Sequence, residues 1–532
     1  MNRRGLTIGL VLLLAAVVTP SSSLEAWFGR APGSLTSGPA IFKILLGFHA
    51  ALLILWSKRR PLLQQRTVVG QPVPWLPLAA LTVLALVLRL IHLNSCLWMD
   101  EIFAVMDNIS PPLNVILTSF ASQNQHMLFS VLARICVVVF GLNEWAVRLP
   151  AVFFGVASLW ALFLLGRRVT GDREALLATA LLTVSYHHIW FSQNARGYSG
   201  LLFFTLAGTW LWLEAERRGS LRFWLLYSLC GALGLWTHLT MAFVLASHAL
   251  ISLAQLGLRR GWRQEGWWIP FASMFLAGTL ALQLHALALP EFLRTGLGEV
   301  SLPSEWTDPL WVVREALRSL KLGFSSVAVL IVGGVVMALG WLDIHRRNAA
   351  AAWSFVLPGV ISGGLMLAMG HNLWPRFFFF CMGFALLIAM HGALKSVELV
   401  RLPPKAGLAV AGLIILASAL TVPRVYRYPK QDFTGARDYV EQFHQPVAAV
   451  GLAANAYAWY APQWQRPVND RQFLDLYQGQ QAEWLVYTLP VHLKAWDPQT
   501  WQIVNRDYRI VREFPGTLGD GTVYVCRRGV QP

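Results

Sequence analysis

Charged residues are scarce in this chain, and cysteines are scarcer still. Only 13% of the 532 residues are charged, whereas 56% are hydrophobic and the mean hydropathy is +0.51. Such a composition excludes an ordinary water-soluble protein and indicates a polytopic membrane protein. The 5 cysteines form no CxxC pair and no zinc-finger spacing, so the sequence contains no cysteine-based metal site that could be recognised.

Thirteen apolar runs approach the roughly 20 residues that a helix needs to cross a bilayer. These runs are 6–19, 40–56, 75–93, 150–166, 175–191, 199–213, 222–238, 239–256, 267–289, 325–342, 353–369, 377–394 and 406–422. We therefore predict a multi-pass α-helical membrane protein. Run 6–19 is short and follows two arginines, so a signal-peptide core is an alternative for it.

Basic residues alternate between the loops that connect these runs. One set of loops holds 20 lysines and arginines and the opposite set holds 9. Because the more basic side of a membrane protein faces the cytoplasm, we expect loop 94–149 and the C-terminal tail to lie outside. The net charge of +16 then reflects this topology and attraction to anionic lipids, not nucleic-acid binding.

Three zones follow along the chain. Residues 1–74 hold two apolar segments and a basic loop, and residues 75–422 form the main membrane body. Loop 94–149 is not strongly polar and is expected to lie along the membrane as short interfacial helices. Residues 423–532 have no spanning run and predict a small α/β domain, with a helix over 432–443 and strands near 447–452, 484–487, 508–514 and 522–526.

Two neighbouring carboxylates, Asp100 and Glu101, follow the apolar run 75–93. An acid at a membrane boundary is costly to desolvate and usually has a function. The same predicted face holds Arg196 and Arg376, and the histidines His126, His187, His188, His238 and His371. A carboxylate base, cations for a lipid phosphate and apolar grooves for its tail are what an enzyme with a lipid-borne donor needs. Each cation could instead anchor its helix at the headgroups.

Five segments in order resemble the protein O-mannosyltransferase-like glycosyltransferases, which have the GT-C fold and include the lipid A aminoarabinose transferase as a relative. The segments are Asp100-Glu101, Asn124 to Leu128, Phe140 to Pro150, Ser192 to Ser199, and Leu235 to His238. The resemblance covers about 75–425. It implies about 11–13 transmembrane helices, with an extracytoplasmic C-terminal α/β domain, in the inner membrane of a bacterium.

The resemblance also implies a function and a site. The chain would transfer a sugar from a polyprenyl-phosphate-linked donor to a protein, lipid or glycan acceptor. Asp100 would be the catalytic base, with Glu101 beside it for orientation or metal binding. Arg196, Tyr198, Arg376, His126 and His238 would contact the donor or its phosphate, although the family's His-x-Pro-Leu lacks its proline here. A divalent metal on Asp100, Glu101 and His126 is an option, since no ligand spacing is diagnostic.

Two alternatives belong to other functional classes. A transporter or flippase of lipid-linked sugars would share the membrane spans, but such proteins often contain internal repeats and broken helices around a midplane site. No repeat is visible here, and the charged candidates gather at one predicted face. A non-catalytic lipid-sugar receptor that presents the C-terminal domain is the second alternative.

Overall fold

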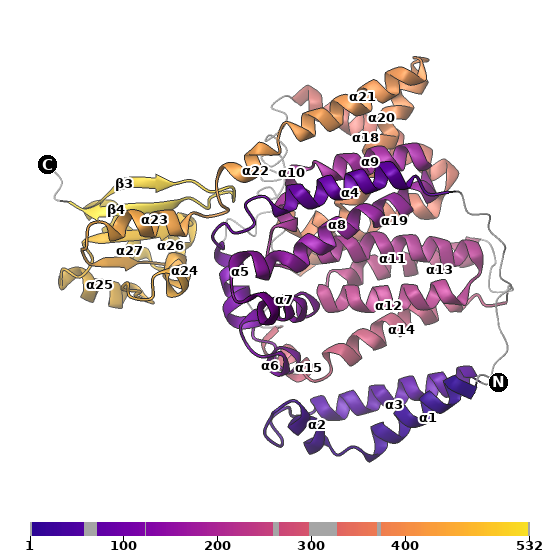
Figure 1. Cartoon of the computed structure of the whole chain (residues 1–532), viewed down its shortest axis with the longest axis horizontal. Coiled ribbons are helices and arrows are strands. Elements are labelled where there is room, and N and C mark those ends of the chain that lie inside the picture. Colours follow the sequence, from indigo (N-terminus) through magenta and orange to yellow (C-terminus); the bar gives the residue numbers. More distant parts are fainter. Residues whose placement is uncertain are drawn as a thin grey trace.

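The chain folds into a bundle of long helices with a small α/β domain at one end (Figure 1). The computed structural model describes residues 3–57, 72–122, 124–258, 265–296, 327–369 and 374–529. The predicted fold class, a multi-pass helical protein with a small C-terminal α/β domain, is confirmed.

Helices make up the membrane part. They are α1 (Arg3–Val18), α2 (Ser21–Trp27), α3 (Gly38–Ser57), α4 (Trp75–Leu90), α5 (Met99–Phe103), the π-helix η1 (Ala104–Ile109), α6 (Leu113–Thr118), α7 (Met127–Phe140), α8 (Glu144–Val169), α9 (Asp172–Thr183), α10 (Tyr186–Ser192), α11 (Tyr198–Arg218), α12 (Leu221–Thr237), α13 (Met241–Leu258), α14 (Ile269–His285), α15 (Leu289–Glu291), the π-helix η3 (Phe292–Gly296), α18 (Val327–Arg347), α19 (Ala349–Ala368), the 3-10 helix η4 (Pro375–Cys381), α20 (Met382–Leu399), α21 (Pro404–Ala419) and α22 (Pro423–Arg427).

Within the described residues each predicted apolar run is largely helical, but fewer of these runs form full-length spans. Among the described residues, 6 helical segments are long and apolar enough to cross a membrane, or up to 8 if each of two bent pairs makes one span. The shortfall arises partly because α4 has only 16 residues, and α12 and α14 have 17 each. The α1–α2 pair bends by 101° and the α14–α15 pair by 94°.

Run 175–191 was predicted as one helix and is two, α9 and α10. The break leaves backbone carbonyl oxygens at the end of α9 without donors from the helix itself. Arg89 of α4, which is fully buried, donates to the carbonyl oxygens of Leu182 and Thr183 at 3.4 and 3.3 Å and contacts His188 Nδ1 at 2.5 Å. A buried arginine from another helix therefore stabilises the break. The same arginine binds the Nδ1 atom of His188.

Loop 94–149 consists of the short helices α5, η1, α6 and α7, as the sequence predicts, followed by the first turns of α8. Helix α8 begins at Glu144, six residues before the predicted start, because the Asn143 side chain caps it by accepting from Ala146 N at 2.9 Å. This early start places Arg148 on the helix, where its side chain is buried.

The C-terminal α/β domain contains a mixed four-stranded sheet in the order β1-β2-β4-β3, with β1 and β2 parallel and the other pairs antiparallel. Its elements are α23 (Phe433–Glu441), β1 (Val447–Ala449), α24 (Leu452–Tyr460), α25 (Asp470–Gln478), β2 (Trp484–Thr488), α26 (Pro490–Trp496), α27 (Pro498–Asp507), β3 (Tyr508–Phe514) and β4 (Val523–Arg528). All four predicted strands and the first predicted helix are present. The apolar strands β1 and β2 are buried along their whole length, which explains their clear sequence signal.

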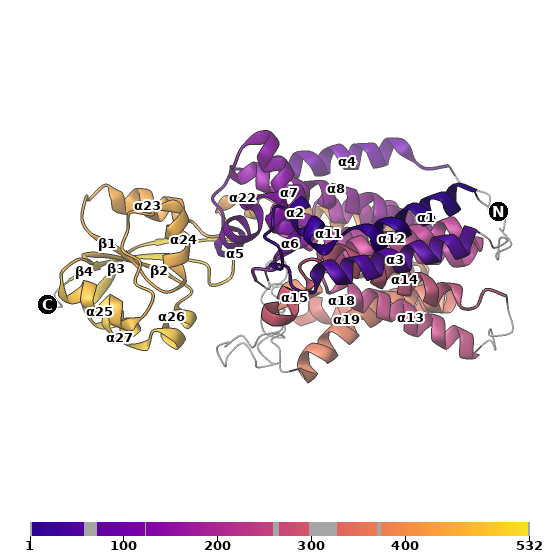
Figure 2. The ribbon, with the colours of Figure 1, turned by 90° about the horizontal axis from the view of Figure 1, so that it is seen from below.

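This domain stands beside α5 and α22, as two perpendicular views show (Figure 2). One hydrophobic cluster is shared between the two parts: it joins Trp98, Met99 and Ile102 around α5 to Tyr457 and Trp484 of the domain. The C-terminal domain and loop 94–149 therefore lie at the same end of the helix bundle, and that end contains the candidate site.

Candidate active site

Asp100 lies in the first turn of α5, where it faces two arginines from distant parts of the chain. Its Oδ2 atom is 3.1 Å from Nη1 of Arg196 and 3.2 Å from Nη1 of Arg376. Arg196 belongs to the turn between α10 and α11, and Arg376 to η4. The Asp100 side chain is 18% exposed, so the carboxylate is accessible although both cations contact it.

Arg196 is almost fully buried and is oriented by its neighbours. Its Nε donates to Nε2 of His126 at 3.1 Å, and its Cζ lies 5.5 Å from the centre of the Tyr198 ring. Gly197 makes this arrangement possible, because a Cβ there would lie 3.0 Å from the His126 Cβ and 3.1 Å from the Thr237 carbonyl oxygen. The sequence Ala-Arg-Gly-Tyr thus contains the guanidinium, the small residue that allows close packing, and a ring beside the charge.

Three rings form one side of the cluster. The rings of His126 and His238 stack at 4.8 Å, and the Tyr198 ring lies 5.7 Å from each. Burial, and next the charge of Arg196, hold the pKa of His126 well below its usual range. His126 is therefore neutral and accepts the hydrogen bond that orients Arg196.

Both arginines keep polar groups without an acceptor. In the described part of the chain, the buried Nη1 of Arg196 and Nε of Arg376 have no hydrogen-bond partner. Nη1 of Arg196 is close to Asp100 but not in hydrogen-bond geometry. Unsatisfied buried donors are uncommon and costly, and donors on two adjacent guanidinium groups suit an anion with several oxygens.

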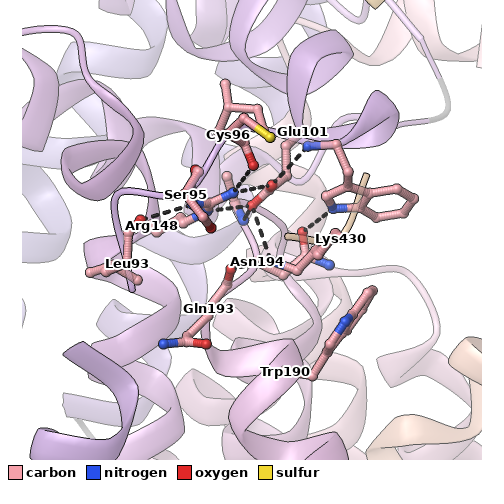
Figure 3. A network of polar contacts seen from close by, with 12 residues as sticks. Leu93, Ser95, Cys96, Glu101, Arg148, Trp190, Gln193, Asn194 and Lys430 are labelled. Carbon is pink, nitrogen blue, oxygen red and sulfur yellow. Dashed lines mark hydrogen bonds and ion pairs between the residues drawn. The ribbon is translucent and has the colours of Figure 1, made fainter. Parts of the chain in front are cut away.

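Glu101 faces a different set of partners (Figure 3). Its side chain is fully buried, and its two oxygens accept from Nε and Nη2 of Arg148 at 2.8 and 2.6 Å. The backbone N–H of Ala195, next to Arg196, donates to Oε1 at 2.6 Å. Although burial alone would raise the pKa of Glu101, the charges of Arg148 and Lys430 and these hydrogen bonds lower it to about 2. Glu101 therefore joins α5, α8 and the Arg196 turn as an ionised carboxylate.

The C-terminal domain holds the segment immediately before Asp100. The backbone N–H of Met99 donates to Oε1 of Gln431 at 2.9 Å, and that of Leu97 donates to the Tyr460 hydroxyl at 2.7 Å. Cys96 Sγ donates to the Gln431 carbonyl oxygen at 3.0 Å. Lys430 donates to the Gln193 carbonyl, and its Nζ lies 3.8 Å from Oε1 of Glu101.

The structure therefore brings together six of the seven predicted site residues, namely Asp100, Arg196, Arg376, Tyr198, His126 and His238. Glu101 is adjacent but turned toward Arg148, and His371 lies outside the described residues. Sequence reasoning missed Arg148, Lys430 and Gln431. Arg148 lies within Phe140 to Pro150, one of the segments that carry the family resemblance, but that segment gave it no role, and Lys430 and Gln431 carry no signal.

The geometry does not fit a metal site on Asp100, Glu101 and His126. Arg196 lies between Asp100 and His126 and contacts both. Both oxygens of Glu101 are bound by Arg148. Within the described ranges, no three His, Cys, Asp or Glu side chains come together in a group that could hold a metal ion.

Known proteins resemble this chain in parts of its sequence and in its fold. Residues 125–283 match the family model of the dolichyl-phosphate-mannose-protein mannosyltransferases. The undecaprenyl phosphate-alpha-4-amino-4-deoxy-L-arabinose arabinosyl transferase of Pseudomonas aeruginosa is 30% identical over 159 residues, which are 28% of each protein. YkcB of Bacillus subtilis is 32% identical over 92 residues, 17% of this chain and 13% of that protein. The matched stretches thus span less than a third of these curated relatives.

The crystal structure of the apo form of the Archaeoglobus fulgidus oligosaccharyltransferase resembles most of the fold. It is 11% identical with a TM-score of 0.50, and the match covers 82% of this chain and 73% of that one. At this identity the likeness concerns the fold alone. The chain thus has the GT-C fold, and its residues 125–283 resemble the dolichyl-phosphate-mannose-protein mannosyltransferase family.

Proposed function

We propose that the chain is a glycosyltransferase that moves a sugar from a polyprenyl-phosphate-linked donor to an acceptor hydroxyl. In this reaction the acceptor oxygen forms a bond to the anomeric carbon, and the bond between that carbon and the phosphate oxygen breaks. The electron pair leaves with the phosphate as polyprenyl phosphate. Asp100 takes the proton of the acceptor hydroxyl.

The observation that carries this proposal is the pair of arginines at Asp100. Negative charge accumulates on the phosphate as the sugar leaves, and guanidinium groups stabilise it best through several hydrogen bonds. Arg196 and Arg376 converge on one carboxylate oxygen, and each has a buried N–H without an acceptor among the described residues. A phosphate that binds these N–H groups replaces Asp100 as the arginines' anion and leaves its carboxylate available to the acceptor.

The names of similar proteins support a donor of this class. The Pseudomonas aeruginosa relative is an arabinosyl transferase named for an undecaprenyl phosphate sugar, and the matched family is named for a dolichyl phosphate sugar. Direct displacement with a single base inverts the anomeric centre. In this proposal the donor sugar is linked to a lipid, and the acceptor lies outside the cytoplasm.

The proposed orientation puts this site outside the cytoplasmic membrane of a bacterium. Its support is the excess of basic residues in the alternate loops, together with the location of loop 94–149 and the C-terminal domain at one end of the bundle. A reporter that is active only in the cytoplasm should give no signal when fused after residue 532. A strong signal would contradict the orientation.

The activity is tested with purified full-length protein and a set of polyprenyl-phosphate sugars, with membrane extracts as the acceptor source. We expect release of free polyprenyl phosphate with at least one donor, and a loss of about 10²–10⁴-fold in Asp100→Asn. Asp107→Asn is the matched control, because Asp107 is an exposed aspartate of the same loop. Equal release by the wild type and Asp100→Asn with every donor would refute the proposal.

A further inference from the structure

A cavity of about 350 Å³ lies at the junction between the helix bundle and the C-terminal domain. Its walls come from the segment after α4 (between His92 and Cys96), from Trp190 of α10, from the end of α22, and from the segment that links α22 to α23. Asp100, Arg196 and Arg376 are not among its lining residues. The cavity is therefore separate from the candidate active site.

The charge of the lining is of one sign. Arg427 contributes a permanent cation, Lys430 an amine and His92 an imidazole, and none of the described residues that line the cavity is Asp or Glu. The Lys430 Nζ lies 3.8 Å from Oε1 of Glu101, and Glu101 is already paired with Arg148 at 2.6 Å. The positive charge of the walls thus has no carboxylate of its own to neutralise it, which favours an anionic ligand.

The same walls are aromatic and partly apolar. Trp190, Tyr426 and Tyr428 line the cavity, and these residue types concentrate where a membrane meets water. Val425 lines it too and packs in a small apolar cluster with Ile189 and Val422, close to the ends of α4 and α21. A cationic side next to an apolar side fits a molecule that has an anionic head and a hydrocarbon tail.

We propose that this cavity binds the phosphate group of an anionic lipid headgroup. The exposed guanidinium of Arg427 supplies a fork for two phosphate oxygens, and the hydroxyl and amide groups of the lining supply further donors. The site does not depend on the proposed glycosyl transfer. Because Lys430 reaches from this cavity to Glu101, a bound lipid fixes the C-terminal domain relative to α5 at the membrane surface.

Native mass spectrometry of the full-length protein in detergent tests the proposal. The probes are dioleoyl phosphatidylglycerol, the zwitterionic dioleoyl phosphatidylcholine, and excess inorganic phosphate as competitor. We expect phosphatidylglycerol to be retained in preference to phosphatidylcholine. Its affinity should fall about tenfold in Arg427→Gln, which corresponds to about 1.4 kcal/mol.

Arg424→Gln is the matched control, because Arg424 is an exposed arginine on the same helix that does not line the cavity. It should bind phosphatidylglycerol within about twofold of the wild type. An equal loss in Arg424→Gln and Arg427→Gln would indicate general attraction to the headgroup region and would overturn the cavity site. Complete displacement of the lipid by inorganic phosphate at low millimolar concentration would overturn the lipid as the ligand.

Discussion

Asp100 and Glu101 are neighbours in the chain, yet their carboxylates are bound by different arginines. Asp100 faces Arg196 and Arg376 at 3.1 and 3.2 Å and is 18% exposed, whereas Glu101 is fully buried against Arg148 at 2.6 Å. Successive side chains on a helix diverge by about 100°, which separates the two environments. The Asp100 carboxylate is thus accessible to a reactant. The Glu101 carboxylate instead joins α5, α8 and the turn that contains Arg196.

This separation predicts that two similar substitutions affect the stability of the protein to different extents. Glu101→Gln should lower the free energy of unfolding by about 3–5 kcal/mol, because it leaves the buried Arg148 without its counter-charge. Asp100→Asn should lower the melting temperature less than Glu101→Gln, because the Asp100 carboxylate is 18% exposed. Tryptophan fluorescence during heating in detergent measures both.

The double variant Glu101→Gln/Arg148→Met provides the control. It removes both charges, so it should regain part of the stability that Glu101→Gln loses. A Glu101→Gln protein as stable as the wild type would contradict the structural role of this ion pair.

Arg196 should not tolerate lysine. Its guanidinium donates to His126 and faces Asp100 through different nitrogens, and a lysine has one point charge for both. Arg196→Ala should reduce donor turnover by about 10²–10³-fold, and Arg196→Lys should lose most of the activity without loss of monodisperse protein. Arg134→Lys is the control, since Arg134 of α7 donates only to the Ser110 carbonyl among the described contacts. Normal turnover by Arg196→Lys would leave the phosphate role to Arg376 alone.

Gln431 should act as a positioning residue for Asp100. Gln431→Met keeps the length of the side chain but removes the acceptor for the Met99 N–H. We expect kcat to fall roughly tenfold with little change in KM for the donor, because small displacements of a catalytic group are costly. Gln442→Met, at an exposed glutamine of the same domain, should have neither effect. A change in KM alone would argue against positioning of the base.

The lowered pKa of the buried Lys430 predicts that the stability of the protein depends on pH. Burial, opposed by Glu101 and reinforced by Arg148, lowers the pKa of Lys430 from 10.5 to about 7. Between these values the unfolded chain binds more protons than the folded one, so stability rises with pH, by at most about 1.4 kcal/mol per pH unit.

The melting temperature of the wild type minus that of Lys430→Met should therefore increase from pH 7 to pH 9.5. The exposed Lys494 provides the comparison, and Lys494→Met should show no such trend. A difference that stays flat or falls over this range would contradict the lowered pKa.

The sequence was most informative where one local signal determined the structure. Apolar runs located the helices, and short apolar stretches such as 484–487 located the strands of the C-terminal domain. Motif order was enough to bring Asp100, Arg196 and His238 to one place. It did not distinguish the roles of Asp100 and Glu101, because the difference depends on Arg148, which is buried only after α8 packs against α5.

Contacts between distant segments left no local trace. Nothing near Gln431 indicates that its side chain binds the backbone of Met99, 332 positions earlier. The break between α9 and α10 likewise depends on Arg89 from another helix. Among the described residues, fewer helices than predicted spans are long enough to cross a membrane, because hydropathy located apolar helices such as α4 without determining their length.

The hydrogen bonds from Leu97 and Met99 to Tyr460 and Gln431 also set an order of events during biosynthesis. A ribosome makes Asp100 early, before most of the bundle, but the acceptors that hold the preceding backbone are made more than three hundred residues later. Domains generally fold as units as they emerge, so the nascent helices assemble while this segment still lacks its native partners. During most of this interval the segment that contains the candidate base lacks its native contacts, and a domain made more than three hundred residues later completes them.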